Sequence, residues 1–272
     1  EDFVLNAAQR AEVIAGLNQI LPAHAVLHEV EDTKPYECDG LSLFRQLPMV
    51  VALPDTEEQV IEILKLANRL NVPVVARGAG TGLSGGAQPH KHGILLGMAK
   101  FNKILKVDVQ SRSAVVQPGV RNLAISEAVA QHQLYYAPDP SSQIACTIGG
   151  NVAENSGGVH CLKYGLTVHN VLKVRAITIE GEIVEFGSEA PDAPGLELMN
   201  LVIGSEGMLA VVTEVTVKLV PKPALAQVIM ASFDDVANAG NAVAAVIAAG
   251  IIPAGLEMMD KRASQMVEPF VK

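Results

Sequence analysis

Three glycine-rich segments, at residues 78–86, 147–158 and 203–207, constrain the fold of this chain more than any other feature of its sequence. Glycine lets the backbone take positive φ angles and lets another group approach the main chain closely. The chain holds 23 glycines and 15 prolines. We therefore expect loops and close approaches to the backbone to matter here.

The first segment, RGAGTGLSGG from Arg77 to Gly86, follows a predicted strand and contains GxGxxG at Gly80, Gly82 and Gly85. A Rossmann dinucleotide site needs a helix next, because the helix N-terminus holds the pyrophosphate. Here the chain continues as AQPHKHG, which is typical of a loop. We therefore predict a nest of inward-pointing N–H groups that binds phosphate without a helix. A glycine-rich turn without a ligand is the alternative.

The second segment, TIGGNVAENSGG at 147–158, contains two Gly-Gly pairs. Missing side chains would let its backbone approach a flat ring, and Asn151, Asn155 and Ser156 can offer hydrogen bonds to ring heteroatoms. Close packing between two layers of chain is the alternative. The third segment, at 203–207, predicts by itself only a tight turn.

The segments between the glycine clusters predict a mixture of helices and strands. A strand at 49–53, a helix that begins with a capping box of Thr56 and Gln59, and a strand at 74–76 form a β-α-β unit with parallel strands. Elsewhere we expect a helix within 1–30, a surface connection at 31–47, strands at 94–96, 171–179 and 183–186, a hairpin of 105–109 with 114–117, a helix at 123–132, a loop at 138–140 and a strand pair within 209–220. After the prolines at 221 and 223 we expect a strand at 226–233, a helix at 234–249 and a strand at 251–257.

The composition narrows the class of protein. With 49% hydrophobic and 18% charged residues, general disorder is excluded. A net charge of −9 without a basic run argues against nucleic-acid binding. Three cysteines without a CxxC pair indicate a reducing compartment. No apolar run is long enough to span a membrane, and EDFVLNAAQR is no secretory signal, so we expect a cytoplasmic protein without a transmembrane segment.

Taken together, the segments PVVARGAGTGLSGGA, APDPSSQIACTIGGNVAENSGG, LVIGSEGMLAVVTEVTVKL and AGIIPAGLEMMD resemble FAD-linked oxidoreductases of the vanillyl-alcohol oxidase type, in the D-lactate dehydrogenase and glycolate oxidase D-subunit branch. The resemblance covers roughly residues 48 to 260. It implies an α+β fold in which FAD lies between two α/β subdomains, at about 48–110 and 111–222. Residues 1–47 would be an N-terminal extension, and 223–272 the beginning of a substrate or cap domain, truncated here.

The resemblance also implies which residues hold the cofactor. The first loop would wrap the pyrophosphate, the second would approach the flavin and ribityl chain, and the third would lie near the adenosine end. The cofactor-binding residues that it implies are Arg77, Gly78, Ala79, Gly80, Thr81, Gly82, Leu83, Ser84, Pro138, Asp139, Ser141, Ser142, Thr147, Gly149, Gly150, Ala153, Asn155, Ser156, Gly158, Glu206, Gly207 and Val211. Relatives that attach FAD covalently use a histidine in the first loop. This loop carries Thr81 instead, so we expect non-covalent FAD, with His160 as the one residue that leaves a second attachment mode open.

The chemistry that the resemblance implies is oxidation of a small 2-hydroxy acid by hydride transfer to the flavin. The base and the carboxylate clamp would come from the cap domain, so no catalytic residue is named here. The histidine-rich metal pattern of that domain is absent from this sequence, and no metal site is expected. Flavin and iron–sulfur partner subunits are implied, and the chain would lie at a membrane only through partners. A FAD-bearing electron-transfer subunit without its own substrate oxidation is the alternative. Other reactions on this scaffold, such as the reductase of peptidoglycan-precursor synthesis or the flavin subunit of a molybdenum hydroxylase, are disfavoured by the AGIIPAGLEMMD tail.

Overall fold

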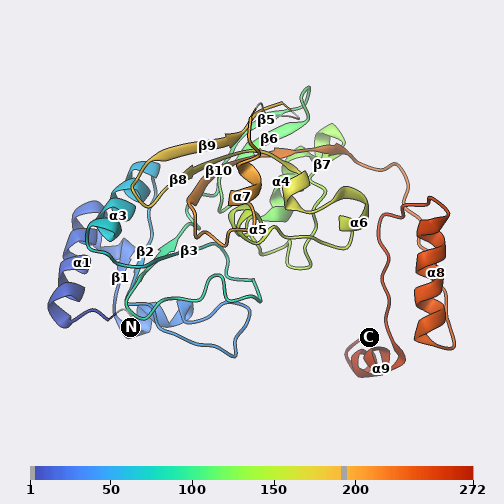
Figure 1. The fold of residues 1–272 in the computed structure, drawn as a ribbon, viewed down its shortest axis with the longest axis horizontal. Coiled ribbons are helices and arrows are strands. Elements are labelled where there is room, and N and C mark those ends of the chain that lie inside the picture. Colours follow the sequence, from blue (N-terminus) through green and yellow to red (C-terminus); the bar gives the residue numbers. More distant parts are fainter. Residues whose placement is uncertain (1–3, 191–194, 272) are drawn as a thin grey trace.

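Two sheets stand side by side in the computed structural model, which describes residues 4–190 and 195–271 (Figure 1). The first sheet has the strand order β1-β2-β4-β3 and the second has the order β5-β6-β10-β8-β9. Each sheet has its own cluster of buried apolar side chains. Ile177 and Val211 of the second sheet belong to the cluster of the first, so the two cores touch. The predicted α+β fold is confirmed.

The first sheet contains the predicted β-α-β unit. Its strands are β1 (Val26–Leu27), β2 (Val50–Ala52), β3 (Val74–Arg77) and β4 (Ile94–Gly97). Strands β2 and β3 both run parallel to β4, which lies between them. Helix α3 (Glu57–Arg69) connects β2 with β3 and begins at the predicted capping box. All residues of β2 and β4 are buried, as expected for parallel strands with both faces covered.

Residues that precede position 48 complete this half of the molecule. Helix α1 (Ala7–Ile20) is confirmed and packs against α3, through Val13 and Leu17 rather than through its exposed alanines. Strand β1 pairs antiparallel with β2. Short helical turns follow at α2 (Val30–Thr33) and η2 (Lys34–Tyr36). The region at 31–47 was predicted as a surface connection, but it includes the buried residue Asp39.

The second sheet is antiparallel throughout. Its strands are β5 (Ile104–Asp108), β6 (Ser113–Val116), β8 (Val171–Ile177), β9 (Ile183–Gly187) and β10 (Val211–Lys218). The predicted hairpin of β5 with β6 is confirmed, and it places residues 104–108 in the second sheet. The strand pair expected within 209–220 is wrong, because β10 is one strand and β11 (Val220–Pro221) pairs with β7 (Leu134–Tyr135) instead.

Helices cover this second sheet and connect its strands. They are α4 (Asn122–Val129), α5 (Ile148–Glu154) and α7 (Met199–Val202), which contribute buried residues to its core. Helix α6 (Cys161–Tyr164) has no buried residue. Single turns lie at η1 (Ala23–Ala25), η3 (Ala130–His132) and η4 (Thr167–His169). The second glycine cluster therefore forms a helix, α5, and not only a loop.

An ion pair joins the two halves. Glu57, at the start of α3, accepts two hydrogen bonds of 2.9 Å from Nε and Nη2 of Arg175 in β8. Its Oε1 also accepts a hydrogen bond of 2.7 Å from the hydroxyl of Thr213 in β10. The Arg175 guanidinium lowers the pKa of the Glu57 carboxyl. This pair therefore fastens the helix of the first half to the sheet of the second.

The C-terminal residues lie apart from the two sheets in Figure 1. Helix α8 (Val236–Ala248) is confirmed, and α9 (Lys261–Val267) and η5 (Glu268–Phe270) follow. The strands predicted at 226–233 and 251–257 are wrong, because these segments have no strand partner within the described chain. An extended segment needs such a partner to satisfy its N–H and C=O groups. None of the helices described, over 4–190 and 195–271, is long and apolar enough to cross a membrane.

Candidate functional site

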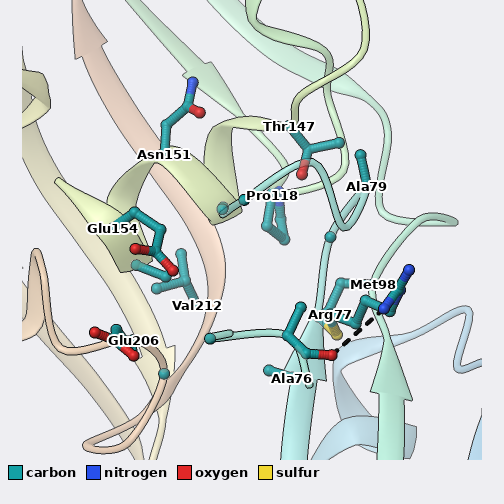
Figure 2. Close-up of a pocket in the computed structure, with 18 of the residues that line it drawn as sticks. Ala76, Arg77, Ala79, Met98, Pro118, Thr147, Asn151, Glu154, Glu206 and Val212 are labelled. Carbon is teal, nitrogen blue, oxygen red and sulfur yellow. Dashed lines mark hydrogen bonds between the residues drawn. The ribbon is translucent and has the colours of Figure 1, made fainter. Parts of the chain in front are cut away.

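A cleft opens where the two halves meet, and all three glycine-rich segments contribute to it (Figure 2). The first segment leaves the end of β3, the second forms α5, and the third leads into β10. The open space measures about 1010 Å³, including the solvent at its mouth.

The first glycine loop bends back on itself after β3. Gly80 and Gly85 have φ angles of +69° and +82°, a region that side chains disfavour. Gly80 packs directly on the guanidinium of Arg77, where a Cβ atom would have no room. Arg77 Nη1 donates to the carbonyl oxygens of Cys38 at 2.9 Å and Ala87 at 3.4 Å. Burial lowers the pKa of Arg77, but these main-chain carbonyls stabilise its positive charge inside the fold.

Asp39 also holds the first glycine loop in place. Its Oδ2 accepts a hydrogen bond of 3.0 Å from the N–H of Gly85, and its Oδ1 accepts one of 2.8 Å from the N–H of Leu41. A Cβ atom on Gly40 would lie 2.8 Å from the carbonyl oxygens of residues 81 and 82. This contact of Asp39 was not predicted from the sequence. Its only local signal is the Asp-Gly pair, which marks a turn but not a contact 46 residues away.

Helix α5 forms the opposite wall and is held tightly at its start. The N–H of Gly149 donates to the carbonyl of Pro118 at 2.8 Å. Asn151 is buried, and its amide donates to Asn122 Oδ1 at 2.8 Å. Asn122 in turn donates to the carbonyl of Pro138 at 2.9 Å. The Asn151 amide, considered above as a ring contact, therefore serves the fold itself.

Thr147 is the residue of this wall that lacks a partner. It precedes α5 and is 7% exposed. Its hydroxyl oxygen has no hydrogen-bond partner anywhere in residues 4–190 and 195–271. Its neighbours are Gly78 and Gly150, which offer no side chain. A buried hydroxyl without a partner costs about 1–3 kcal/mol, so this group is suited to a ligand that hydrogen-bonds to it.

Comparison with known proteins decides the family. Residues 48–187 match the family model described as FAD binding domain, and residues 222–272 match the C-terminal domain of FAD linked oxidases. The chain belongs to the FAD-linked oxidoreductases. The resemblance inferred from the glycine segments is thereby confirmed, with FAD as the cofactor of the family.

Individual relatives agree with this assignment. The chain is 59% identical over 270 residues to the glycolate oxidase subunit GlcD of Escherichia coli K12, covering 99% of this chain and 54% of the relative. It is 40% identical over 220 residues to the D-lactate dehydrogenase of Archaeoglobus fulgidus, covering 80% of this chain and 49% of the relative. The chain thus spans about half the length of the curated relatives it matches.

Solved structures share the fold at lower identity. An alkyldihydroxyacetonephosphate synthase matches with a TM-score of 0.76 and 22% identity, over 90% of this chain and 47% of its own. A p-cresol methylhydroxylase matches with a TM-score of 0.70 and 20% identity, over 81% and 45% of the two chains. These likenesses show that the chain shares the overall fold of these two proteins.

The residues of the cleft fit FAD. Glycines and alanines form much of both walls, so the backbone is open to a flat ring and to phosphate. The Thr147 hydroxyl supplies an unused hydrogen-bonding group on one wall. These features come together in the cleft where the two halves of the molecule meet.

Most of the residues expected to bind FAD line this cleft. They are Arg77, Gly78, Ala79, Gly80, Thr81, Gly82, Ser142, Thr147, Gly149, Gly150, Ala153, Ser156, Glu206, Gly207 and Val211. Seven others do not line it, namely Leu83, Ser84, Pro138, Asp139, Ser141, Asn155 and Gly158. Asn155 ends α5 with a φ of +50°, and its side chain accepts from the N–H of Val168 at 3.0 Å.

Two of the residues outside the cleft belong to one contact. Asp139 Oδ2 lies 2.6 Å from Nδ1 of His160, and Asp139 Oδ1 accepts from the His160 N–H at 3.2 Å. Gly158 packs against Asp139 so closely that a Cβ atom would have no room. Asp139 and Gly158 therefore fasten the loop at 138–140 to the end of the second glycine segment.

Several lining residues were not predicted from the sequence. They are Ala76, Ala87, Met98, Pro118, Cys146, Glu154, Val202, Ser205, Ala210 and Val212. Many are small or apolar, and their sequence pattern is that of ordinary core. Glu154 is different, because a charged residue in the second glycine segment could have been singled out from the sequence.

Proposed function

We propose that this chain is the flavin-binding part of an enzyme that oxidises a small 2-hydroxy acid, of the glycolate or D-lactate type, to the 2-oxo acid. The observation that carries the proposal is the meeting of both glycine-lined walls at one cleft within a chain that matches the FAD binding domain over residues 48–187. The 59% identity to a glycolate oxidase subunit supports the substrate class. Electrons would pass to an acceptor other than oxygen.

FAD, when bound, supplies an acceptor for the hydride that leaves Cα of the substrate. The residues of this chain bind and orient. The first glycine loop, with Gly78 to Ser84, would hold the pyrophosphate through main-chain N–H groups. Thr147 and the glycines of α5 would lie against the flavin and the ribityl chain. Glu206 and Gly207, with Val211, would lie near the adenosine end, and the loop at 138–142 along the cofactor.

Non-covalent attachment is part of the proposal. The first loop carries Thr81 where a histidine would be needed for a covalent bond. His160 does not line the cleft, and its Nδ1 is engaged by Asp139 at 2.6 Å. A general base and a clamp for the substrate carboxylate would come from the C-terminal domain, of which residues 222–272 match the beginning.

The name of one relative supports a proposal about partner subunits. The name of the E. coli relative describes a subunit. We propose that the whole protein works with a further flavin subunit and an iron–sulfur subunit, in the cytoplasm, and contacts a membrane only through them.

The first experiment is the visible absorption spectrum of the purified chain, repeated on the supernatant after acid precipitation. We expect a flavin spectrum that moves into the supernatant, with FAD as the released species. Colour that stays in the pellet would contradict non-covalent binding and return attention to His160. A colourless protein that takes up no added FAD would refute the functional proposal.

A further inference from the structure

The cleft holds two carboxylates, Glu154 and Glu206, on the wall across from Arg77 and Met98 (Figure 2). A Cβ atom on Gly86 would collide with Glu154 Oε1 and would lie 3.5 Å from Glu206 Oε2, so the first glycine loop passes close to both. A negative charge is unfavourable beside the pyrophosphate of FAD. We therefore expect Glu154 and Glu206 to contact a part of FAD other than the pyrophosphate.

Glu154 lies on the face of α5 that lines the cleft. Thr147, Gly150 and Glu154 are spaced i, i+3 and i+7, which places them on one face of a helix. All three line the cleft. The unpartnered and buried hydroxyl of Thr147 stands at the start of this face, and the Glu154 carboxylate stands at its end. Both residues carry a hydrogen-bonding group and line the same cleft.

Ser84 fixes the orientation of Glu154. The Ser84 hydroxyl donates to Glu154 Oε2 at 2.7 Å and so ties the first glycine loop to the second wall. This bond occupies only one of the two carboxylate oxygens. Oε1 is directed toward Gly82 and Gly86, which have no side chains, and it accepts no hydrogen bond from any residue of 4–190 or 195–271. A carboxylate only accepts hydrogen bonds, so its partner must be a donor.

We propose that Glu154, with Glu206 beside it, binds hydroxyl groups of FAD and thereby determines specificity for the sugar part of the cofactor. Within FAD, the donors that suit a carboxylate are the ribose diol of the adenosine and the hydroxyls of the ribityl chain. The inference rests on the proposed binding of FAD and adds the role of Glu154. Ser84 is a positioning residue, since it acts on the ligand through Glu154.

The test measures the dissociation constant of FAD for the wild-type chain and for Glu154→Ala, Glu154→Gln and Ser84→Ala. A lost hydrogen bond to a charged acceptor predicts roughly tenfold weaker binding for Glu154→Ala, with a smaller loss for Glu154→Gln and for Ser84→Ala. Glu12→Gln, at an exposed position of α1, removes the same charge far from the cleft and should leave binding unchanged. Binding that is unchanged or tighter in both Glu154 variants would overturn the proposal, because a carboxylate that only repels the pyrophosphate predicts tighter binding.

Two further arms identify the hydroxyl. In one, ADP and 2′-deoxy-ADP compete with FAD, and in the other FAD is compared with its 2′-deoxyribityl analogue. A deoxy ligand that binds more weakly to the wild type but not to Glu154→Ala locates the contact and supports the proposal. Equal losses in both proteins for every deoxy ligand would overturn it, as would FAD binding that requires a divalent cation removable by EDTA. A chain that binds no FAD at all would instead refute the proposed function.

Discussion

Gly149 offers the sharpest test of how the second wall of the cleft is built. It lies in the first turn of α5, and its N–H donates to the Pro118 carbonyl at 2.8 Å. A Cβ atom added there would lie 2.6 Å from the Pro118 Cβ, 3.1 Å from its carbonyl oxygen and 3.2 Å from its Cα. Two of these are backbone atoms, which cannot rotate away. The substitution Gly149→Ala must therefore push α5 from the turn that holds it.

The magnitude follows from three contributions. Carbon atoms prefer separations of about 3.5–4.0 Å, so the gap must widen by about 1 Å. Overpacking of this kind costs about 1–3 kcal/mol, and weakening the Gly149 hydrogen bond costs about 1 kcal/mol more. Alanine returns up to about 1 kcal/mol through its helix propensity. We expect the free energy of unfolding to fall by about 1–3 kcal/mol in the protein without FAD.

Gly150→Ala is the matched control, because the nearest atom to its added Cβ is Thr147 Oγ1 at 3.8 Å. Without FAD, this variant should be unchanged or stabilised by up to about 1 kcal/mol. Both variants should bind FAD more weakly, since both alter the wall. Thermal unfolding measures the difference in stability between the two variants. For domains of 150–250 residues, each kcal/mol shifts the Tm by about 2–4 °C. Equal stability of the two variants without FAD would refute this account of the wall.

Two other predictions concern the ion pair and the free hydroxyl. Replacing Arg175 by Met should lower the free energy of unfolding by about 1–3 kcal/mol at neutral pH, because the pair is charge-assisted and bidentate but still about a quarter exposed. Arg175 lowers the pKa of Glu57 in the folded state. The ion pair therefore stabilises the fold fully at pH values above 4.5, the ordinary pKa of the carboxyl, and this stabilisation is lost as the pH falls through the pKa of Glu57 in the folded state. Urea titrations of both proteins should therefore converge in acid, and a constant difference down to the lowest pH would contradict the argument. Thr147→Val should weaken FAD binding about fivefold, yet leave the FAD-free protein as stable as the wild type or more so, because it removes a buried hydroxyl without a partner. Isothermal titration and thermal unfolding measure the two effects, and a loss of stability without a loss of affinity would be evidence that the hydroxyl serves the fold.

The sequence by itself determined the local elements and the family. The capping box of Thr56 and Gln59 begins α3 as expected, since all its partners lie within three residues. The glycines of the first loop predicted positive φ angles, and the structure has them at Gly80 and Gly85. Buried strands such as β4 read as apolar runs because both faces are covered. Each of these features depends on residues that are close together in the sequence, so it can be predicted from the sequence alone.

Tertiary structure alone decided which distant residues meet. Asp39 reaches Gly85 across 46 residues, Ser84 reaches Glu154 across 70, and Glu57 reaches Arg175 across 118. Contacts of this kind leave no periodicity or spacing in a single sequence. The same limit made the strands at 226–233 and 251–257 wrong, because a strand exists only where another strand satisfies its backbone groups. Local preference favours an element, but hydrogen bonding and packing against distant segments decide whether it forms and what it faces.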